Sequence, residues 1–228
     1  MGKVRAVCIS EKRGTQKKNI ESAVFVENWG IEGDAHAGNW HRQISLLSEE
    51  TIAAFKARGA EVTDGAFGEN LVVSGYDFTK FPVGTRFTCK DVVLELTQIG
   101  KECHHGCEIF QKMGECIMPT NGVFAKVLHG GKISVGDEFH VQYRAAVITL
   151  SDTASKGERE DASGAVAEEI VRKEGYEVVF KKIIPDDGDS LTALLCELSD
   201  EDKADLILTT GGTGFSKRDN TPEATMRA

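Results

Sequence analysis

The sequence predicts a mixed fold in two parts: a β-rich, barrel-like domain over residues 1–143, and a partial α/β domain with a parallel sheet over residues 145–228. Short strand candidates separated by Gly, Pro or Asp fill the first part, which is typical of an antiparallel barrel or rolled sheet. Strand and helix patterns alternate in the second part, which favours a parallel sheet with right-handed crossovers. The residue types change at the same point, because all six histidines and five of the six cysteines precede residue 145.

Charge also differs between the two parts. Residues 1–144 hold 17 Lys and Arg against 18 Asp and Glu, whereas residues 145–228 hold 10 against 18, so the net charges are −1 and −8. This acidic balance, without basic or aromatic clusters, argues against nucleic-acid binding. The chain has no run of 18 apolar residues and no cationic-then-apolar N-terminal segment. We therefore expect a soluble, cytoplasmic protein that does not enter a membrane.

In the first part, one helix is predicted at residues 48–58, where Ser48 stands as N-cap before Ile52 and Phe55. Residues 131–137 read as a turn that leads into the last strand. The predicted strands of this part are residues 4–9, 22–26, 43–47, 70–73, 86–89, 91–97 and 137–141.

In the second part, strands are predicted at residues 145–150, 177–184 and 204–208. Apolar residues recur at helical spacing over residues 161–174, and Gly175 ends that helix. A second helix follows the second strand, with Asp189 or Ser190 as its cap. Its apolar face is Leu191, Leu194, Leu195 and Leu198.

A glycine-rich loop follows the third strand. Gly211-Gly212-Thr213-Gly214 lets the backbone approach a ligand and point its N–H groups outward, so the loop can hold an anionic group. Ser216-Lys217-Arg218-Asp219 adds a hydroxyl, cations and a carboxylate suited to magnesium or to general-base work. Thr221 is the expected N-cap of a further helix, with Pro222 at its first position. The loops after all three strands should meet where open α/β sheets bind ligands.

Ser151-Asp152 follows the first strand and Pro185-Asp186 follows the second. Together with the glycine-rich loop and the residues up to Pro222, these motifs resemble the signature of the molybdopterin adenylyltransferase family. That family activates molybdopterin with ATP before molybdenum insertion. The resemblance implies that Asp186 and Asp219 position the metal and phosphate of Mg-ATP, and that Gly211, Gly212, Thr213 and Gly214 line the pterin phosphate site.

The resemblance covers residues 145–228, whereas domains of this family are roughly twice as long, on the usual domain scale of about 100–150 residues. We therefore expect the segment to be the first half of such a domain, incomplete at its C-terminus, and we expect adenylylation only from the complete domain.

Five motifs in the first part occur in the order seen in another family. They are Gly33-Asp34-Ala35-His36 with His41-Arg42-Gln43, Phe67-Gly68-Glu69-Asn70-Leu71, the segment from Gly100 to Cys107, the segment from Gly122 to Val127, and Gly136-Asp137. Together they resemble the MOSC domain, a β-rich fold that binds molybdenum cofactor. The resemblance implies that Cys103 is the reactive cysteine that holds sulfur or ligates molybdenum, with Cys107 and Cys116 as neighbours that leave the assignment open.

The residue types agree with such a site. A thiolate is a soft ligand for molybdenum or sulfane sulfur, and the cationic neighbours of Cys103 favour the thiolate. His41 and Arg42 can meet the pterin phosphate, since arginine offers a bidentate fork. Asn70 can hold a pterin edge through its amide, and Ser216 is placed with the phosphate-binding residues.

Blander interpretations remain open. The ligands in Cys103-His104-His105-Gly106-Cys107, with Cys116 as a possible fourth, could form a structural zinc site, or the thiols could be buried and inert. His36 and His41 could hydrogen-bond loops only, and Asp152 could merely cap its loop. A pyridoxal phosphate site would need a lysine placed for a Schiff base, and no strand-plus-lysine context suggests one.

The leading hypothesis is a protein that couples two steps of molybdenum cofactor biosynthesis. The C-terminal part would adenylylate molybdopterin, and the MOSC part would bind or sulfurate the finished cofactor. The expected ligands are molybdopterin and ATP, with a molybdoenzyme or a sulfur-donor protein as partner and oligomerisation as an option. The alternatives are a non-catalytic carrier that stores and hands over cofactor, and a zinc-stapled interaction module.

Overall fold

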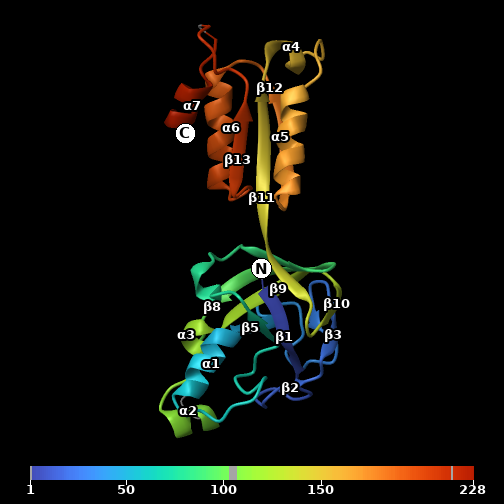
Figure 1. Ribbon diagram of the computed structural model, residues 1–228, viewed down its shortest axis with the longest axis vertical. Helices are drawn as coiled ribbons and strands as arrows, with labels where there is room; N and C mark the ends of the chain where they lie inside the picture. The colour runs from blue at the N-terminus through green and yellow to red at the C-terminus, as the bar shows by residue number, and fades with distance from the viewer. Residues whose placement is uncertain (1, 103–106, 217) are drawn as a thin grey trace. The chain divides into compact units, whose positions relative to one another are not determined.

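The computed structural model describes residues 2–102, 107–216 and 218–228 (Figure 1). It divides the chain into two compact units, Met1–Val141 and Gln142–Ala228. Strand β11 (Glu138–Leu150) crosses the boundary, so its first residues pair in unit 1 and its later residues pair in unit 2. No helix in the described ranges is both long and apolar enough to cross a membrane.

Unit 1 is built mainly from short strands. Its helices are α1 (Glu49–Ala57), the 3-10 helix η1 (Phe78–Lys80), α2 (Glu108–Met113) and α3 (Met118–Asn121). Its strands, besides the start of β11, are β1 (Gly2–Ile9), β2 (Lys18–Asn19), β3 (Ser22–Val26), β4 (Gly30–Ile31), β5 (Ile44–Ser48), β6 (Leu71–Ser74), β7 (Arg86–Cys89), β8 (Val92–Ile99), β9 (Val123–His129) and β10 (Gly131–Ser134).

The large sheet of unit 1 follows the order β11-β7-β8-β9-β5-β6-β1, and β1 pairs in turn with β11, so the path of paired strands returns to its start. Strands β5 and β6 run parallel, whereas β7–β8, β8–β9, β9–β5, β6–β1 and β1–β11 are antiparallel. Alternate residues of β8 face a core that includes the aromatic rings of Phe78, Phe87 and Phe139. Strands β10, β3 and β4 form a separate antiparallel sheet.

The predicted helix at residues 48–58 is confirmed as α1. The Ser48 hydroxyl caps it by accepting a hydrogen bond from the backbone N–H of Thr51 at 3.3 Å, and Ile52 and Phe55 are buried beneath it. The prediction of a turn over residues 131–137 was wrong in its first half. Residues Gly131–Ser134 form β10, because pairing with β3 satisfies their backbone groups. Strand β9 and helices α2 and α3 were not predicted.

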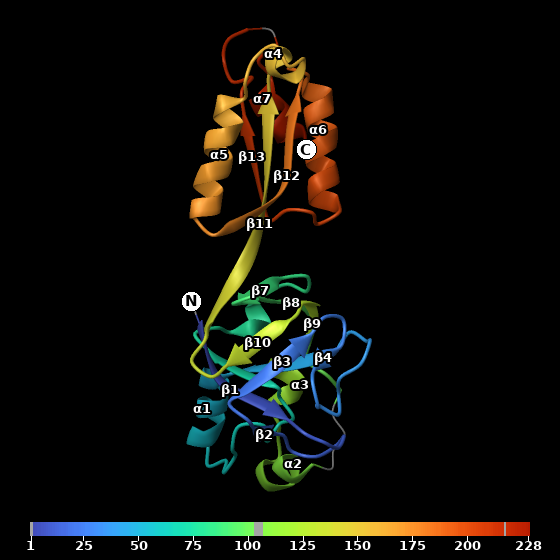
Figure 2. The ribbon, with the colours of Figure 1, turned by 90° about the vertical axis from the view of Figure 1, so that its right-hand side faces the viewer.

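Unit 2 has three parallel strands. The later part of β11 lies between β12 (Tyr176–Ile184) and β13 (Leu206–Thr210), which confirms the predicted parallel pairing. Helix α5 (Ala162–Lys173) covers one face of this sheet through Val171, and α6 (Gly188–Asp200) covers the other through four leucines (Figures 1 and 2). The remaining helices are α4 (Asp152–Ser155) and α7 (Thr221–Arg227).

Two helix caps in unit 2 differ from the prediction. The cap of α6 is Asp187 rather than Asp189 or Ser190, because the Asp187 carboxylate accepts a hydrogen bond from the backbone N–H of Ser190 at 2.9 Å. Helix α7 begins at Thr221 itself, after Asn220, and the Thr221 hydroxyl turns back to the glycine loop. The short α4, capped by Ser151, was not predicted.

Candidate functional site

The three strands of unit 2 end at one edge of their sheet. Leu150 is paired with Ile184, and Thr149 with Thr210, so the loops that follow β11, β12 and β13 start side by side. These loops carry Ser151-Asp152, Pro185-Asp186 and the glycine turn. The structure therefore brings the three predicted motifs of the C-terminal part together.

The glycine turn is held in a conformation that only glycine fits. Gly211 and Gly212 have φ angles of 91° and 61°, and a Cβ atom on Gly211 would lie 2.1 Å from the Leu150 carbonyl oxygen. Thr221 ties the turn to the start of α7, since its hydroxyl donates to the Gly211 carbonyl at 2.9 Å and its N–H donates to the Gly212 carbonyl at 3.0 Å. The backbone of the turn is thus fixed at close range to the strand ends.

Asp152 and Asp186 lock the first two loops together. The Asp152 backbone N–H donates to the Asp186 carboxylate at 3.1 Å, and the Asp186 N–H donates to the Asp152 carboxylate at 3.2 Å. Asp186 Oδ1 is buried, and no hydrogen-bond partner for it exists within the described ranges. It would lie 3.6 Å from a Cβ atom on Gly212, so this oxygen faces the glycine turn.

Arg218 brings a cation to the same place. Its guanidinium grips the Asp152 carboxylate with both terminal nitrogens, at 2.8 and 3.0 Å, and lies 3.4 Å from the Asp186 carbonyl. Asp219 instead closes its own loop, because its carboxylate accepts from the Ser216 backbone N–H at 2.9 Å. Sequence reasoning did not list Asp152 or Arg218 as site residues, although both stand in the quoted motifs. Lys217 lies outside the described residues.

In unit 1, His41 and Arg42 gather around Gln98. The Gln98 side-chain oxygen lies 3.0 Å from His41 Nε2 and accepts from Arg42 Nε at 2.9 Å. The Arg42 guanidinium lies 5.3 Å from the centre of the Phe124 ring, and the Lys101 ammonium lies 5.9 Å from it. The predicted phosphate-binding pair thus lies in one cluster with Gln98, Phe124 and Lys101, and the segment that contains Cys103 follows Lys101 in the sequence.

Comparison with known families agrees with this arrangement. Residues 33–140 match the MOSC domain family, and residues 146–228 match the family described as probable molybdopterin binding domain. The chain carries a MOSC domain followed by a molybdopterin-binding domain. We therefore call Met1–Val141 the MOSC unit and Gln142–Ala228 the molybdopterin-binding unit.

The molybdopterin-binding unit is similar to curated proteins. A molybdopterin adenylyltransferase of Pyrococcus furiosus is 45% identical over 82 residues, which are 36% of this chain and 47% of that protein. Its Escherichia coli counterpart is 38% identical over 86 residues, 36% of this chain and 44% of the relative. The chain thus spans about half the length of the curated relatives it matches.

One solved structure supports the fold alone. The YuaD protein of Bacillus subtilis is 22% identical to this chain, with a TM-score of 0.54, and the match covers 62% of this chain and 96% of that one. The mixed α and β fold class is confirmed.

The cysteines of the MOSC unit divide into buried and accessible ones. Burial raises the pKa of Cys8 to about 12 and that of Cys89 to about 11, so these two thiols belong to the core. Cys107 is exposed and caps α2, with its sulfur 3.5 Å from the Phe110 N–H, and Cys116 packs half-buried against the core around α1. Cys103 and its histidine neighbours lie outside the described residues. No metal-binding group of three His, Cys, Asp or Glu occurs among residues 2–102, 107–216 and 218–228.

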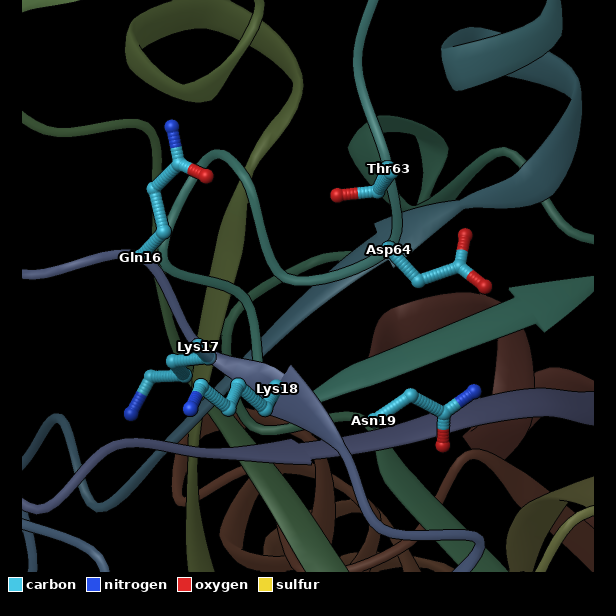
Figure 3. Close-up of a pocket in the computed structure, with 6 residues that line it drawn as sticks. All are labelled: Gln16, Lys17, Lys18, Asn19, Thr63 and Asp64. Carbon is cyan, nitrogen blue, oxygen red and sulfur yellow. The ribbon is translucent and has the colours of Figure 1, made fainter.

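Two pockets of the MOSC unit contain none of the predicted site residues. Figure 3 shows the first, of about 390 Å³, with Gln16, Lys17, Lys18 and Asn19 on one wall and Thr63 and Asp64 opposite. The second, of about 400 Å³, shares Gln16 and Thr63 with it and extends to α2. The Lys17 backbone N–H donates to the Gly65 carbonyl at 2.9 Å, so the two walls of the first pocket are tied together.

Asn70 lies inside the MOSC unit, with only 2% of its surface exposed. Its side-chain oxygen accepts from the N–H and hydroxyl of Ser45, at 3.1 and 3.0 Å, and its amide donates to the Cys8 carbonyl at 3.0 Å. The amide that was expected to hold a pterin edge thus joins β1, β5 and β6.

Glu69 is buried beside Asn70 and holds the preceding loop by accepting from the N–H groups of Gly65 and Phe67, at 2.6 and 3.0 Å. Burial raises the pKa of Glu69 from an ordinary 4.5 to about 7. The folded protein therefore keeps a proton that the unfolded chain releases above pH 4.5. The contribution of Glu69 to the free energy of unfolding therefore falls as pH rises from 4.5 to about 7, and it is constant above pH 7.

We expect this pH dependence to vanish in Glu69→Gln. Between pH 4.5 and 7 the wild type should lose about 3 kcal/mol relative to the variant, because one pKa unit corresponds to roughly 1.4 kcal/mol. Urea unfolding followed by tryptophan fluorescence measures this difference, since both tryptophans, Trp29 and Trp40, are in the MOSC unit. The exposed Glu61→Gln is the control. Parallel pH profiles for wild type and Glu69→Gln would show that Glu69 titrates normally.

Proposed function

We propose that the chain acts in molybdenum cofactor biosynthesis, and that its molybdopterin-binding unit binds molybdopterin and, as part of the complete domain, adenylylates it with ATP. The observation that carries the proposal is the convergence of Asp186, Arg218 and the Gly211–Gly212 turn at one sheet edge. Backbone N–H groups, a guanidinium and a carboxylate are the groups that phosphate transfer requires.

The residues present also fit a divalent cation. Asp186 Oδ1 is buried without a described hydrogen-bond partner, and a hard cation prefers carboxylate and phosphate oxygens. When bound, magnesium would neutralise phosphate charge at this edge of the sheet. Asp186 would hold it, with Asp219 as the further carboxylate of the loop. Arg218 would bind phosphate oxygens through the N–H groups that it does not direct to Asp152, and Asp152 would hold the guanidinium in place.

In the MOSC unit, we assign cofactor binding to the cluster of His41, Arg42 and Lys101, and the role of sulfur carrier or molybdenum ligand to Cys103. The closed circuit of strand pairs supports the expected barrel beneath this site. The Arg42 guanidinium is already oriented by Gln98 and Phe124, so a phosphate would meet a prepared partner. A molybdoenzyme or a sulfur-donor protein would be the partner of this unit.

Metal and pterin content after exposure to molybdenum cofactor tests this assignment. We expect Cys103→Ser to lose molybdenum, because a serine hydroxyl is a poor substitute for a soft thiolate ligand. Cys107→Ser is the matched control, since Cys107 is exposed and only four residues away. Stoichiometric zinc in the wild type, or equal molybdenum in wild type and Cys103→Ser, would contradict the role of Cys103.

The alternative is a non-catalytic carrier that stores and hands over the cofactor. Formation of adenylylated molybdopterin from ATP by the full-length protein separates the two functions. Turnover that is lost in Asp186→Asn supports the enzyme, whereas tight pterin binding without turnover supports the carrier.

A further inference from the structure

A buried ion pair lies in the MOSC unit away from the residues assigned so far. Lys17 Nζ lies 2.5 and 2.7 Å from the two carboxylate oxygens of Asp34, and the two side chains are only 1% and 0% exposed. The Ser10 backbone N–H also donates to Asp34, at 2.9 Å. A buried ion pair costs solvation energy, so it is weak support for stability by itself. Its position next to His36 indicates another use.

The third contact of the Lys17 ammonium bears on the protonation and tautomer of His36. Two of its three N–H groups are directed to Asp34, and the remaining one lies 3.2 Å from His36 Nδ1. An ammonium group has no lone pair to accept a hydrogen bond, so Nδ1 must be the acceptor. With Lys17 charged, this contact favours a neutral His36 imidazole with its proton on Nε2. Burial, followed by the charge of Lys17, lowers the pKa of His36, which agrees with this neutral form.

The rest of the ring edge is available to a ligand. The His36 side chain is one-third exposed, and Nε2 has no hydrogen-bond partner among residues 2–102, 107–216 and 218–228. The backbone around it is fixed, because Trp40 Nε1 donates to the His36 carbonyl at 3.0 Å and the His36 N–H donates to Asp34 at 3.3 Å. The charges of Arg13 and Lys101 both act on the ring. An N–H donor in cationic surroundings suits an anionic oxygen.

We propose that the His36 Nε2–H group donates a hydrogen bond to an anionic oxygen of the molecule bound in the MOSC unit, and that Lys17 and Asp34 are positioning residues that select this tautomer. The inference rests on the proposed function for the identity of that molecule, the molybdenum cofactor. The acceptor is an oxygen of the cofactor's phosphate or an oxygen on its molybdenum, and both offer the same chemistry to the donor.

The tautomer is tested first, on the full chain without ligand. Nitrogen-15 NMR of the histidine rings at pH 7 should show His36 with one protonated nitrogen, Nε2, and an unprotonated Nδ1. Protonation at Nδ1, at both nitrogens, or rapid exchange between tautomers would overturn the positioning role of Lys17. This measurement does not depend on any cofactor, so it stands apart from the proposed function.

Ligand binding is tested with two replacements of His36. Phenylalanine keeps the ring shape but has no donor, whereas the amide nitrogen of glutamine can take the place of Nε2. We expect His36→Phe to weaken cofactor binding roughly 10- to 100-fold, as expected for a lost hydrogen bond to a charged group. His36→Gln should bind within a few-fold of wild type. Equal binding by wild type and His36→Phe would overturn the inference, while no binding by wild type would instead contradict the proposed function.

Binding of a second ligand, metal-free molybdopterin, distinguishes the two possible sources of the anionic oxygen. Metal-free molybdopterin carries the phosphate but no oxygen on molybdenum. If His36→Phe weakens the binding of both forms equally, the acceptor is a phosphate oxygen. If only the molybdenum-loaded form is weakened, the acceptor is an oxygen on the metal. Both results support the donor role of Nε2.

Discussion

Replacement of Lys17 by methionine is expected to lower the free energy of unfolding of the MOSC unit by about 3–5 kcal/mol, since removal of one partner leaves the other as an uncompensated buried charge. That partner is Asp34, whose carboxylate side chain is 0% exposed. Lys17 and hydrogen bonds counteract the burial of Asp34 and hold its pKa below the ordinary value. Methionine matches the length of the lysine stem, so the loss reports on charge more than on packing.

Urea unfolding followed by tryptophan fluorescence measures this effect in the full chain, because both tryptophans lie in the MOSC unit. Lys18→Met is the control, since Lys18 is the exposed neighbour of Lys17. The double replacement of Lys17 by methionine and Asp34 by asparagine should recover part of the loss, as no buried charge remains. A Lys17→Met variant as stable as Lys18→Met would show that the Asp34 carboxylate is solvated or protonated without its partner.

Replacement of Gly211 by alanine is expected to abolish molybdopterin binding and to disturb the strand ends of the molybdopterin-binding unit. Two costs combine. The φ angle of 91° is unfavourable for alanine by about 1–2 kcal/mol, and the added Cβ atom would lie 2.1 Å from the Leu150 carbonyl oxygen. A backbone carbonyl cannot rotate away as a side chain does, so the turn must shift relative to the end of β11.

Gly157→Ala is the matched control in the same unit. Gly157 also has a left-handed φ angle, of 77°, but nothing lies within 4 Å of the position of its Cβ atom. We expect it to keep molybdopterin binding, with only the conformational cost. Calorimetric titration with molybdopterin and hydrogen exchange at residues 146–152 measure the two effects. Equal binding by Gly211→Ala and Gly157→Ala would mean that the turn does not form the phosphate site.

The local motifs of the molybdopterin-binding unit predicted its structure well. Helix α6 follows from the spacing of its leucines, and the parallel order of β11, β12 and β13 follows from the strand-helix alternation. The caps were less predictable. Asp187, Asp189 and Ser190 are all good capping residues close together in the sequence, and the choice of Asp187 depends on where β12 stops and the backbone turns.

The MOSC unit was less predictable at the level of residue roles. Asn70 is polar and lies in a family motif, which suggested a ligand contact, yet its amide joins three strands in the interior. Strand β9 is buried along most of its length, so its apolar run does not show the alternation by which half-buried strands are detected. Strand β10 is stabilised by its pairing with β3, and the residue pattern of β10 alone does not predict that pairing.

The amino-acid sequence by itself therefore determines local features. Glycines mark the left-handed turn, the spacing of apolar residues selects helix or strand, and the alternation of elements places the loops at one edge of a parallel sheet. Long-range pairings are decided by the tertiary structure. Arg218 meets Asp152 across 66 residues, and Lys17 meets Asp34 and His36 across 17 and 19. The physical reason is that water solvates each charged side chain in the unfolded chain, so no partner is preferred there. A charged side chain needs a specific partner only when folding removes it from water, and the fold decides which group that is.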